Sequence, residues 1–383
     1  MIEGNSTMNL FDYIKDYGFL TFEEFPFNEV DNLIFSYLAY VNLDSIYTEH
    51  MSIKEASDAY FMYYSQEELD EDKSFTKKSK YAMREMAKTR RFSTLKICNY
   101  INITDEVWRA QFAALTIELD EHSAYVSYRG TDDNIFAWKE CFSMSIGIIP
   151  AQDMAARYLN TVGNDYKHLI IGGHSKGGNL AIYASAKCSS KIKSRITTIY
   201  SNDGPGFLKE FVDTNAISEL ADKIIHIIPE NAVIGMLMES PVEPTVIKSN
   251  AISVIQHDST TWLTDQNRFI RTELAITSKK FHDIVLNWLI GIPQEQRIEV
   301  IDDLFSILEA SGAHTITDLQ NIGFNNWAPM SAEANNASET TKKVFEELFL
   351  LFYKEAEDSA PILQKIRKIL NIPIDDILKE EDE

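Results

Sequence analysis

The sequence predicts an α/β fold built on a mostly parallel sheet. Between about residues 110 and 260, short runs rich in β-branched residues alternate with segments of helical character, and this alternation is typical of βαβ units. A cluster of glycines separates one such strand from the following helix, and the flanking regions have helical patterns. We therefore expect three parts: a mostly helical N-terminal segment packed on the core (1–100), an α/β core (101–264) and a C-terminal helical appendage (265–383).

The elements follow from the spacing of apolar residues along the chain. In the N-terminal segment, 30–41 is apolar with helical spacing, and the charged stretch 67–91 is interpreted as a solvated helix face. The core strands are expected at 112–119, 124–128, 168–172, 195–201 and 223–228, and its helices at 138–148, 154–160, 176–186 and 207–220. The appendage has a helical pattern throughout, broken at glycine and proline positions.

Charge and composition exclude several classes of protein. The net charge is −22 and the isoelectric point is near 4.8, so the chain lacks the basic surface that nucleic acids or anionic membranes attract. Three cysteines without a C-x-x-C spacing indicate neither a disulfide framework nor a zinc motif. The start of the chain has no secretory pattern, and no apolar run is long enough for a transmembrane segment. A cytoplasmic protein is the expectation.

The glycine cluster carries the clearest chemical signal. The chain has only 15 glycines, yet four of them fall within 172–178, in the sequence GGHSKGG. This stretch contains G-x-S-x-G centred on Ser175, with an apolar strand before it and a helix after it, which is the setting of a nucleophile elbow. Such a tight turn needs small residues around the serine and holds its hydroxyl above the sheet. Ser175 is therefore the predicted nucleophile; the alternative is a glycine-rich turn without chemistry.

A serine nucleophile needs a general base and two N–H groups that stabilise an oxyanion. The first N–H is expected from Lys176, directly after the nucleophile, and the second from Thr131, in the loop after the strand at 124–128. Of the eight histidines, His257 is the expected base, because it follows the last predicted strand and comes after the serine in the chain. His174 stands within the turn itself and cannot fold back onto the serine hydroxyl.

The acid that would orient His257 has two candidates. Glu230 follows the second strand after the nucleophile strand, where this architecture usually has its acid, and Asp203 lies in the SNDGPG loop after the first. The sequence leaves both open.

Several motifs, occurring in order, resemble those of the Mbeg-like bacterial proteins. They are VDNLIFSYLAYVNL, SYRGTDDNIFAW, GGHSKGGNLA, SNDGPGF and QHDSTTW. The resemblance covers roughly residues 25–265. It implies similarity to class 3 lipases and hence the α/β-hydrolase fold.

In such lipases the elbow reads GHSLGG, so Ser175 matches the nucleophile and Thr131 matches the oxyanion threonine of an FRGT-type strand end. The lipase pattern would place the acid near Ala232, which has no carboxyl group. The resemblance therefore implies that the acid is displaced to Glu230 or Asp203, or is missing.

Together, the residues and the resemblance predict a serine hydrolase that cleaves a small-molecule or lipid-like ester through a Ser–His–acid triad. No metal or organic cofactor is implied. Two alternatives remain: a catalytically silent α/β-hydrolase scaffold that binds a partner, and an acyltransferase that uses the same triad. An apolar helix face at 345–353 either packs as core on the α/β body or lines a channel to Ser175, as a lid would.

Overall fold

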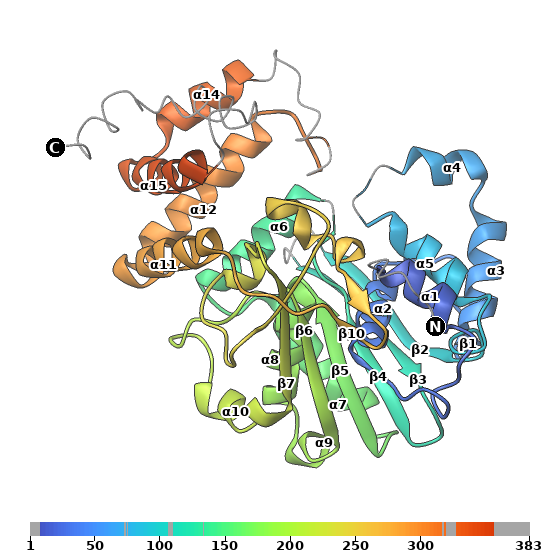
Figure 1. The fold of residues 1–383 in the computed structure, drawn as a ribbon. Coiled ribbons are helices and arrows are strands. Elements are labelled where there is room, and N and C mark those ends of the chain that lie inside the picture. Colours follow the sequence, from blue (N-terminus) through green and yellow to red (C-terminus); the bar gives the residue numbers. More distant parts are fainter. Residues whose placement is uncertain are drawn as a thin grey trace.

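An eight-stranded sheet forms the centre of the molecule, and its strands lie side by side in chain order (Figure 1). The computed structural model describes residues 8–355, apart from 73, 75, 106–109, 133, 316–317 and 319–326. The strands are β1 (Met51–Ser52), β2 (Lys96–Asp105), β3 (Ala110–Glu118), β4 (Ser123–Tyr128), β5 (His168–His174), β6 (Ile196–Asn202), β7 (Ile224–Pro229) and β8 (Thr245–Ile247). Strands β1 to β4 pair antiparallel, whereas β4 to β8 pair parallel.

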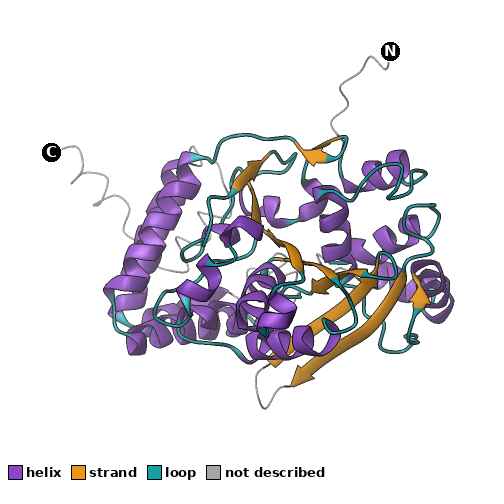
Figure 2. Cartoon of the chain, turned by 90° about the horizontal axis from the view of Figure 1, so that it is seen from below, coloured by secondary structure: helices purple, strands orange, loops and turns teal. Residues whose placement is uncertain are grey.

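Helices lie on both sides of the sheet (Figure 2). They are α1 (Leu10–Tyr17), α2 (Glu29–Leu38), α3 (Ile53–Tyr63), α4 (Gln66–Glu71), α5 (Lys78–Met86), α6 (Ile135–Phe142), α7 (Pro150–Val162), α8 (Lys176–Lys187), α9 (Ser190–Lys193), α10 (Thr214–Ser218), α11 (Ile276–Gly291), α12 (Gln294–Glu309), α14 (Trp327–Asn336) and α15 (Glu339–Glu355). Helices α7 and α8 cover one face, and α1, α2 and α5 cover the other. This arrangement, with the predicted mostly parallel sheet, is that of an α/β hydrolase.

The alternation of side chains along β4 shows how the two layers form. Ala124, Val126 and Tyr128 point into the core shared with α7 and α8, whereas Tyr125 points into the core shared with α2. Successive residues of a strand face opposite sides of the sheet, so a strand that is buried on both faces is largely apolar, and a polar side chain in it needs a partner, as Ser127 has in the Phe35 carbonyl oxygen at 2.9 Å. This explains why the core strands lack polar alternation.

The N-terminal segment is joined to the sheet through α2, which is buried along almost its whole length. The Arg91 guanidinium pairs with the Asp31 carboxylate at 2.5 Å, and neither side chain is exposed to solvent. The interpretation of 67–91 as a solvated face is therefore wrong for Arg91, which serves as an internal anchor.

Three segments differ from the sequence prediction. The long strand β2 begins inside the part that we expected to be helical, because it is stabilised by pairing with β3 rather than by its own pattern. Only α10 is helical within 207–220. The stretch before α11 holds a small hairpin, β9 (Thr264–Asp265) and β10 (Arg268–Phe269), where helix was expected.

The helices α11, α12, α14 and α15 are stacked at one end of the α/β body (Figure 1). From the apolar face of α15, Phe345 packs on a small cluster that includes Ile307 and Met330, and Leu348 packs against the main core. The side chains of 349–353 lie outside the described residues. In the part of the chain that the structure describes, no helix is both long and apolar enough to cross a membrane.

Candidate active site

Ser175 lies in a sharp turn between β5 and α8. Its φ and ψ angles are 59° and −133°, a left-handed conformation that is rare for a residue with a side chain and that stores strain. A Cβ atom on Gly173 would lie 2.3 Å from the carbonyl carbon of Gly177, and one on Gly177 would lie 2.1 Å from the Tyr128 oxygen. The turn can therefore close only with glycine on both sides, which is the geometry of a nucleophile elbow.

His257 and Asp203 form a buried pair. The Nδ1 atom of His257 lies 2.6 Å from Oδ2 of Asp203, and the Asp203 side chain is almost completely buried. The other carboxylate oxygen accepts a hydrogen bond from the Gly235 N–H at 3.0 Å. Both oxygens are thus held, and Nε2 of His257 is the ring nitrogen left available for a proton from a nucleophile.

Glu230 does not take part in this pair. It contributes backbone hydrogen bonds to Ile247 and Ala275, and its side chain makes no hydrogen bond to His257. Topology explains the difference: Asp203 follows β6, which is adjacent to β5 in the sheet, whereas Glu230 follows β7, one strand further from the elbow. Of the two candidate acids, the structure therefore brings Asp203 to the histidine.

His174, the residue before the nucleophile, holds the backbone of His257. Its Nε2 donates to the His257 carbonyl oxygen at 2.9 Å, and the two rings lie 4.7 Å apart. Because Nε2 carries the proton, Nδ1 accepts the hydrogen bond from the Tyr40 hydroxyl at 2.9 Å. Burial lowers the pKa of His174 to about 3, so the ring stays neutral at pH 7. No sequence pattern predicted that Tyr40, which lies in the N-terminal segment, would contact His174.

Thr131 lies against the nucleophile turn, where an oxyanion hole is expected. A Cβ atom on the preceding Gly130 would lie 2.9 Å from Cβ of Ser175, so the two loops touch. Thr131 is 1% exposed, and its hydroxyl makes no hydrogen bond of normal geometry, although the Cys141 thiol lies beside it. Among the described backbone contacts, the Thr131 N–H donates to no acceptor.

The backbone N–H and the side chain of Lys176 have different surroundings. Its N–H is at the first position of α8, where helix geometry provides no acceptor. Its side chain turns away and is buried, with Nζ 2.7 Å from the Glu140 carboxylate and 2.9 Å from the Gln111 carbonyl oxygen. The charge beside the elbow is therefore neutralised, and the ion pair fastens the elbow to α6.

Helix α6 contacts two neighbours of Ser175 in the candidate site, His257 through Trp138 and Lys176 through Glu140. Ser175 is only 2% exposed, and the Trp138 ring of α6 lies 6.4 Å from the His257 ring. The Trp138 Nε1–H donates to the Asp132 carbonyl oxygen at 3.0 Å, which fixes the indole over the oxyanion loop. The sequence placed a helix here without indicating that it would contact these residues.

The appendage contacts α6, and Nδ1 of His282 in α11 also lies 2.8 Å from the carbonyl oxygen of Met236, next to Gly235. The Ile135 N–H donates to the His314 carbonyl oxygen at 3.1 Å, and Lys139 forms an ion pair with Asp302 of α12 at 2.7 Å. A cavity of about 410 Å³ lies between α6 and α12, and Ser175 is not among its lining residues. The appendage is thus placed to support α6.

The comparisons with known proteins identify the family. The model of the Mbeg1-like family matches residues 86–306, more than half of the chain. The chain belongs to the Mbeg1-like family. A search of the curated proteins finds no significant match to this Mbeg1-like chain. A crystal structure of M37 lipase is similar at 13% sequence identity, over 68% of this chain and 79% of that chain, with a TM-score of 0.31. This TM-score is too low to establish a shared fold.

Two buried histidines should make the protein sensitive to acid. Burial lowers the pKa of His174 to about 3 and that of His226 to about 4. In the unfolded chain both histidines have a pKa of about 6.5, so below this pH the unfolded state binds more protons than the folded state. The stability that comes from keeping these histidines neutral is fully present above about pH 6.5. As the pH falls toward the pKa of the folded state, each histidine should lower the free energy of unfolding by about 1.4 kcal/mol per pH unit.

Urea unfolding at several pH values between about 5 and 7.5 checks this slope. His226→Asn should reduce this slope by about 1.4 kcal/mol per pH unit, whatever the substitution does to the free energy of unfolding at neutral pH. His122→Asn, at an exposed position, should leave it unchanged. Equal slopes in the wild type and His226→Asn would contradict the expectation.

Proposed function

We propose that this protein is a serine hydrolase that cleaves an ester through an acyl-enzyme. Ser175 acts as the nucleophile, His257 as the general base and Asp203 as the acid that orients it. The observation that carries the proposal is the strained, glycine-flanked Ser175 turn beside a buried His257–Asp203 pair. Strain of this kind persists only where the surrounding structure holds it, and it is concentrated at functional sites.

The proposed reaction follows from the positions of the donors and acceptors. Asp203 keeps the proton on Nδ1 of His257, which leaves Nε2 to take the proton from the Ser175 hydroxyl as its oxygen attacks the ester carbonyl carbon. The negative charge on the carbonyl oxygen is received by the N–H groups of Lys176 and Thr131. When the tetrahedral intermediate collapses, the C–O bond to the alcohol breaks, and Nε2 gives the alcohol its proton. Water then repeats the sequence and releases the acid.

In this structure no hydrogen bond joins the Ser175 hydroxyl to His257. Catalytic hydrogen bonds are often long before substrate binds and tighten in the complex. Because Ser175 is 2% exposed, the residues around it must move to admit a substrate. We therefore infer that substrate binding opens the site and aligns Ser175 with His257.

The surroundings favour a small-molecule or lipid-like ester. Ile252 and Ile255, which precede His257 in the chain, are 74% and 60% exposed, and we propose that they offer apolar contact to such a substrate. The strongly acidic chain is unsuited to a nucleic acid as substrate. The three cysteines are free and buried, and we propose a reducing compartment such as the cytoplasm.

The burial of Ser175 also supports a second candidate, a silent α/β-hydrolase scaffold whose function is binding. A nucleophile that never becomes accessible cannot turn over. Acyl transfer to an alcohol is a variant of the first proposal, because the same acyl-enzyme reacts with a different acceptor.

A fluorophosphonate probe separates the enzyme from the scaffold, because it reacts covalently only with an activated and accessible serine. The full chain should be labelled, Ser175→Ala should not, and Ser189→Ala, at an exposed position, should be labelled like the wild type. Circular dichroism should show that all three are folded. Absence of labelling in the folded wild type after long incubation would reject the hydrolase and favour the scaffold. If labelling occurs, product analysis with an ester and an added alcohol separates hydrolysis from transfer.

A further inference from the structure

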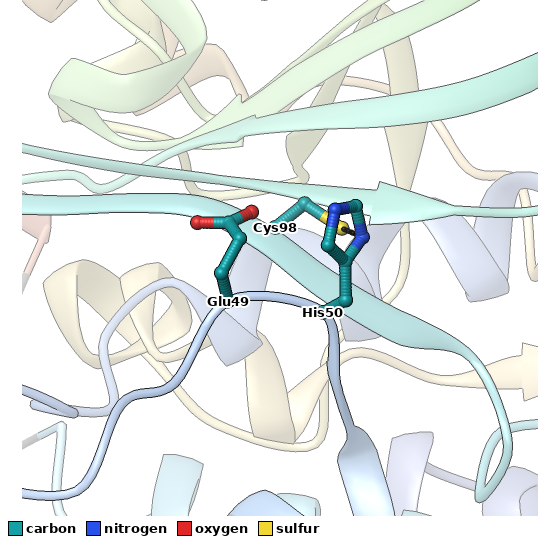
Figure 3. A group of neighbouring side chains, drawn as sticks. All are labelled: Glu49, His50 and Cys98. Atoms are coloured by element: carbon teal, nitrogen blue, oxygen red, sulfur yellow. Dashed lines mark hydrogen bonds between the residues drawn. The ribbon is translucent and has the colours of Figure 1, made fainter.

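Three different metal-ligating side chains meet at the antiparallel half of the sheet, three strands away from the nucleophile strand. Glu49 and His50 precede β1, and Cys98 lies in β2 (Figure 3). One carboxylate oxygen, a ring nitrogen and the sulfur all lie within 4.8 Å of one another, and Nδ1 of His50 is 3.1 Å from Sγ of Cys98. The cluster has no part in the proposed ester chemistry.

Glu118 supplies a fourth ligand from the neighbouring strand β3. Its Oε2 lies 3.6 Å from Nδ1 of His50, and its Oε1 accepts a hydrogen bond from the Tyr166 hydroxyl at 3.1 Å. Ligand atoms that bind zinc at about 2.0–2.3 Å in a tetrahedron are separated by about 3.3–3.7 Å. The His50 nitrogen is therefore spaced from the Cys98 sulfur and from the Glu118 oxygen almost as a tetrahedral ion would require.

The backbone and its neighbours hold the Glu49 side of the cluster in place. His50 and Asn99 have φ angles of 59° and 53°, so both adopt left-handed conformations that are uncommon for residues other than glycine. The Asn99 N–H donates to one Glu49 oxygen at 2.9 Å, and the Tyr47 hydroxyl donates to the other at 2.6 Å. Such contacts orient carboxylates that bind metals and leave their remaining lone pairs free.

The charge of the cluster is uncompensated. Within the described part of the chain, neither Glu49 nor Glu118 forms an ion pair with a lysine or arginine; the only basic partner is His50. A bound divalent cation would neutralise the carboxylates and displace the thiol proton to solvent.

We propose that Glu49, His50, Cys98 and Glu118 form a zinc site that fastens the loop before β1 to the start of β2 and the end of β3. A thiolate and an imidazole favour zinc, whereas magnesium and calcium prefer sites built from oxygen alone. Four protein ligands leave no open position, so the site is structural rather than catalytic. The four residues come from three separate segments and match no short motif.

Cobalt(II) tests this site directly, because a cobalt–thiolate bond gives a near-ultraviolet charge-transfer absorption. The full chain, first freed of metal with a chelator, should bind one equivalent of cobalt with this absorption, and zinc should displace it. His50→Asn removes one ligand while asparagine tolerates the left-handed backbone. We expect it to weaken zinc binding at least tenfold, and Cys98→Ser should abolish the absorption.

His122→Asn is the matched control, because His122 is also an exposed loop histidine but lies outside the cluster. Its zinc affinity should equal that of the wild type. The proposal is overturned if the wild type shows no thiolate absorption with cobalt, or if His50→Asn binds zinc as tightly as the wild type. Neither result depends on esterase activity, so the test is independent of the proposed function.

Discussion

Replacing Asp203 with asparagine should lower kcat for ester hydrolysis on the order of 10⁴-fold while leaving the fold intact. In the proposed mechanism the carboxylate, 2.6 Å from Nδ1 of His257, keeps the proton on that nitrogen and stabilises the imidazolium that forms during the reaction. An amide in its place favours the wrong tautomer, and in the best-known triad this substitution costs about 10⁴ in turnover. Steady-state kinetics with a chromogenic ester measures the effect.

Glu230→Gln provides the matched control. It makes the same change from carboxylate to amide at the other candidate acid, whose side chain has no contact with His257, and it keeps the backbone bonds to Ile247 and Ala275. We expect kcat within about twofold of the wild type. If the effects are reversed, Glu230 is the orienting acid; if neither variant loses turnover, no acid takes part in the mechanism.

Replacing Arg91 with methionine should lower the free energy of unfolding by about 3–5 kcal/mol. The Arg91 and Asp31 side chains are both completely buried, so the substitution leaves Asp31 as an uncompensated charge in the protein interior. Arg91 also donates to the Phe25 carbonyl oxygen at 2.7 Å, a bond that methionine cannot replace. Urea denaturation at pH 7 measures the loss.

Arg90→Met is the control for this prediction. Arg90 is 65% exposed and lies 3.7 Å from Glu24, and such a surface pair contributes about 0–1 kcal/mol. Similar losses in the two variants would show that the buried pair has no special role. The double variant Asp31→Asn/Arg91→Met, which removes both charges, should recover part of the stability.

Hydrogen bonds connect α2, which Arg91 anchors through Asp31, to the candidate active site. Asn32 of this helix donates to the Asn202 side chain at 2.9 Å, and the Asn202 carbonyl oxygen accepts the hydrogen bond from the Ser175 N–H at 2.9 Å. The N-terminal segment thus supports the elbow from below the sheet. This connection explains why the segment packs as part of the core.

The elements with a local signal could be predicted from the amino-acid sequence. The strand–GGHSKGG–helix pattern located Ser175 because only glycine permits that turn, and the apolar runs located β3 to β7 because these strands are buried on both faces. Similar reasoning placed Thr131 after a strand end and His257 after the last predicted strand, although β8, which lies between that strand and His257, was not predicted.

Only the tertiary structure decided which groups meet. Asp203 rather than Glu230 contacts His257 because β6, not β7, lies beside β5, and strand neighbours cannot be deduced from spacing along one chain. Strand β2 was missed because its stability comes from pairing with β3. Tyr40, which contacts His174, and the cluster around Cys98 join segments that are far apart in the sequence. Local patterns report backbone preference and burial, whereas side-chain contacts of this kind arise only when the sheet brings distant segments together.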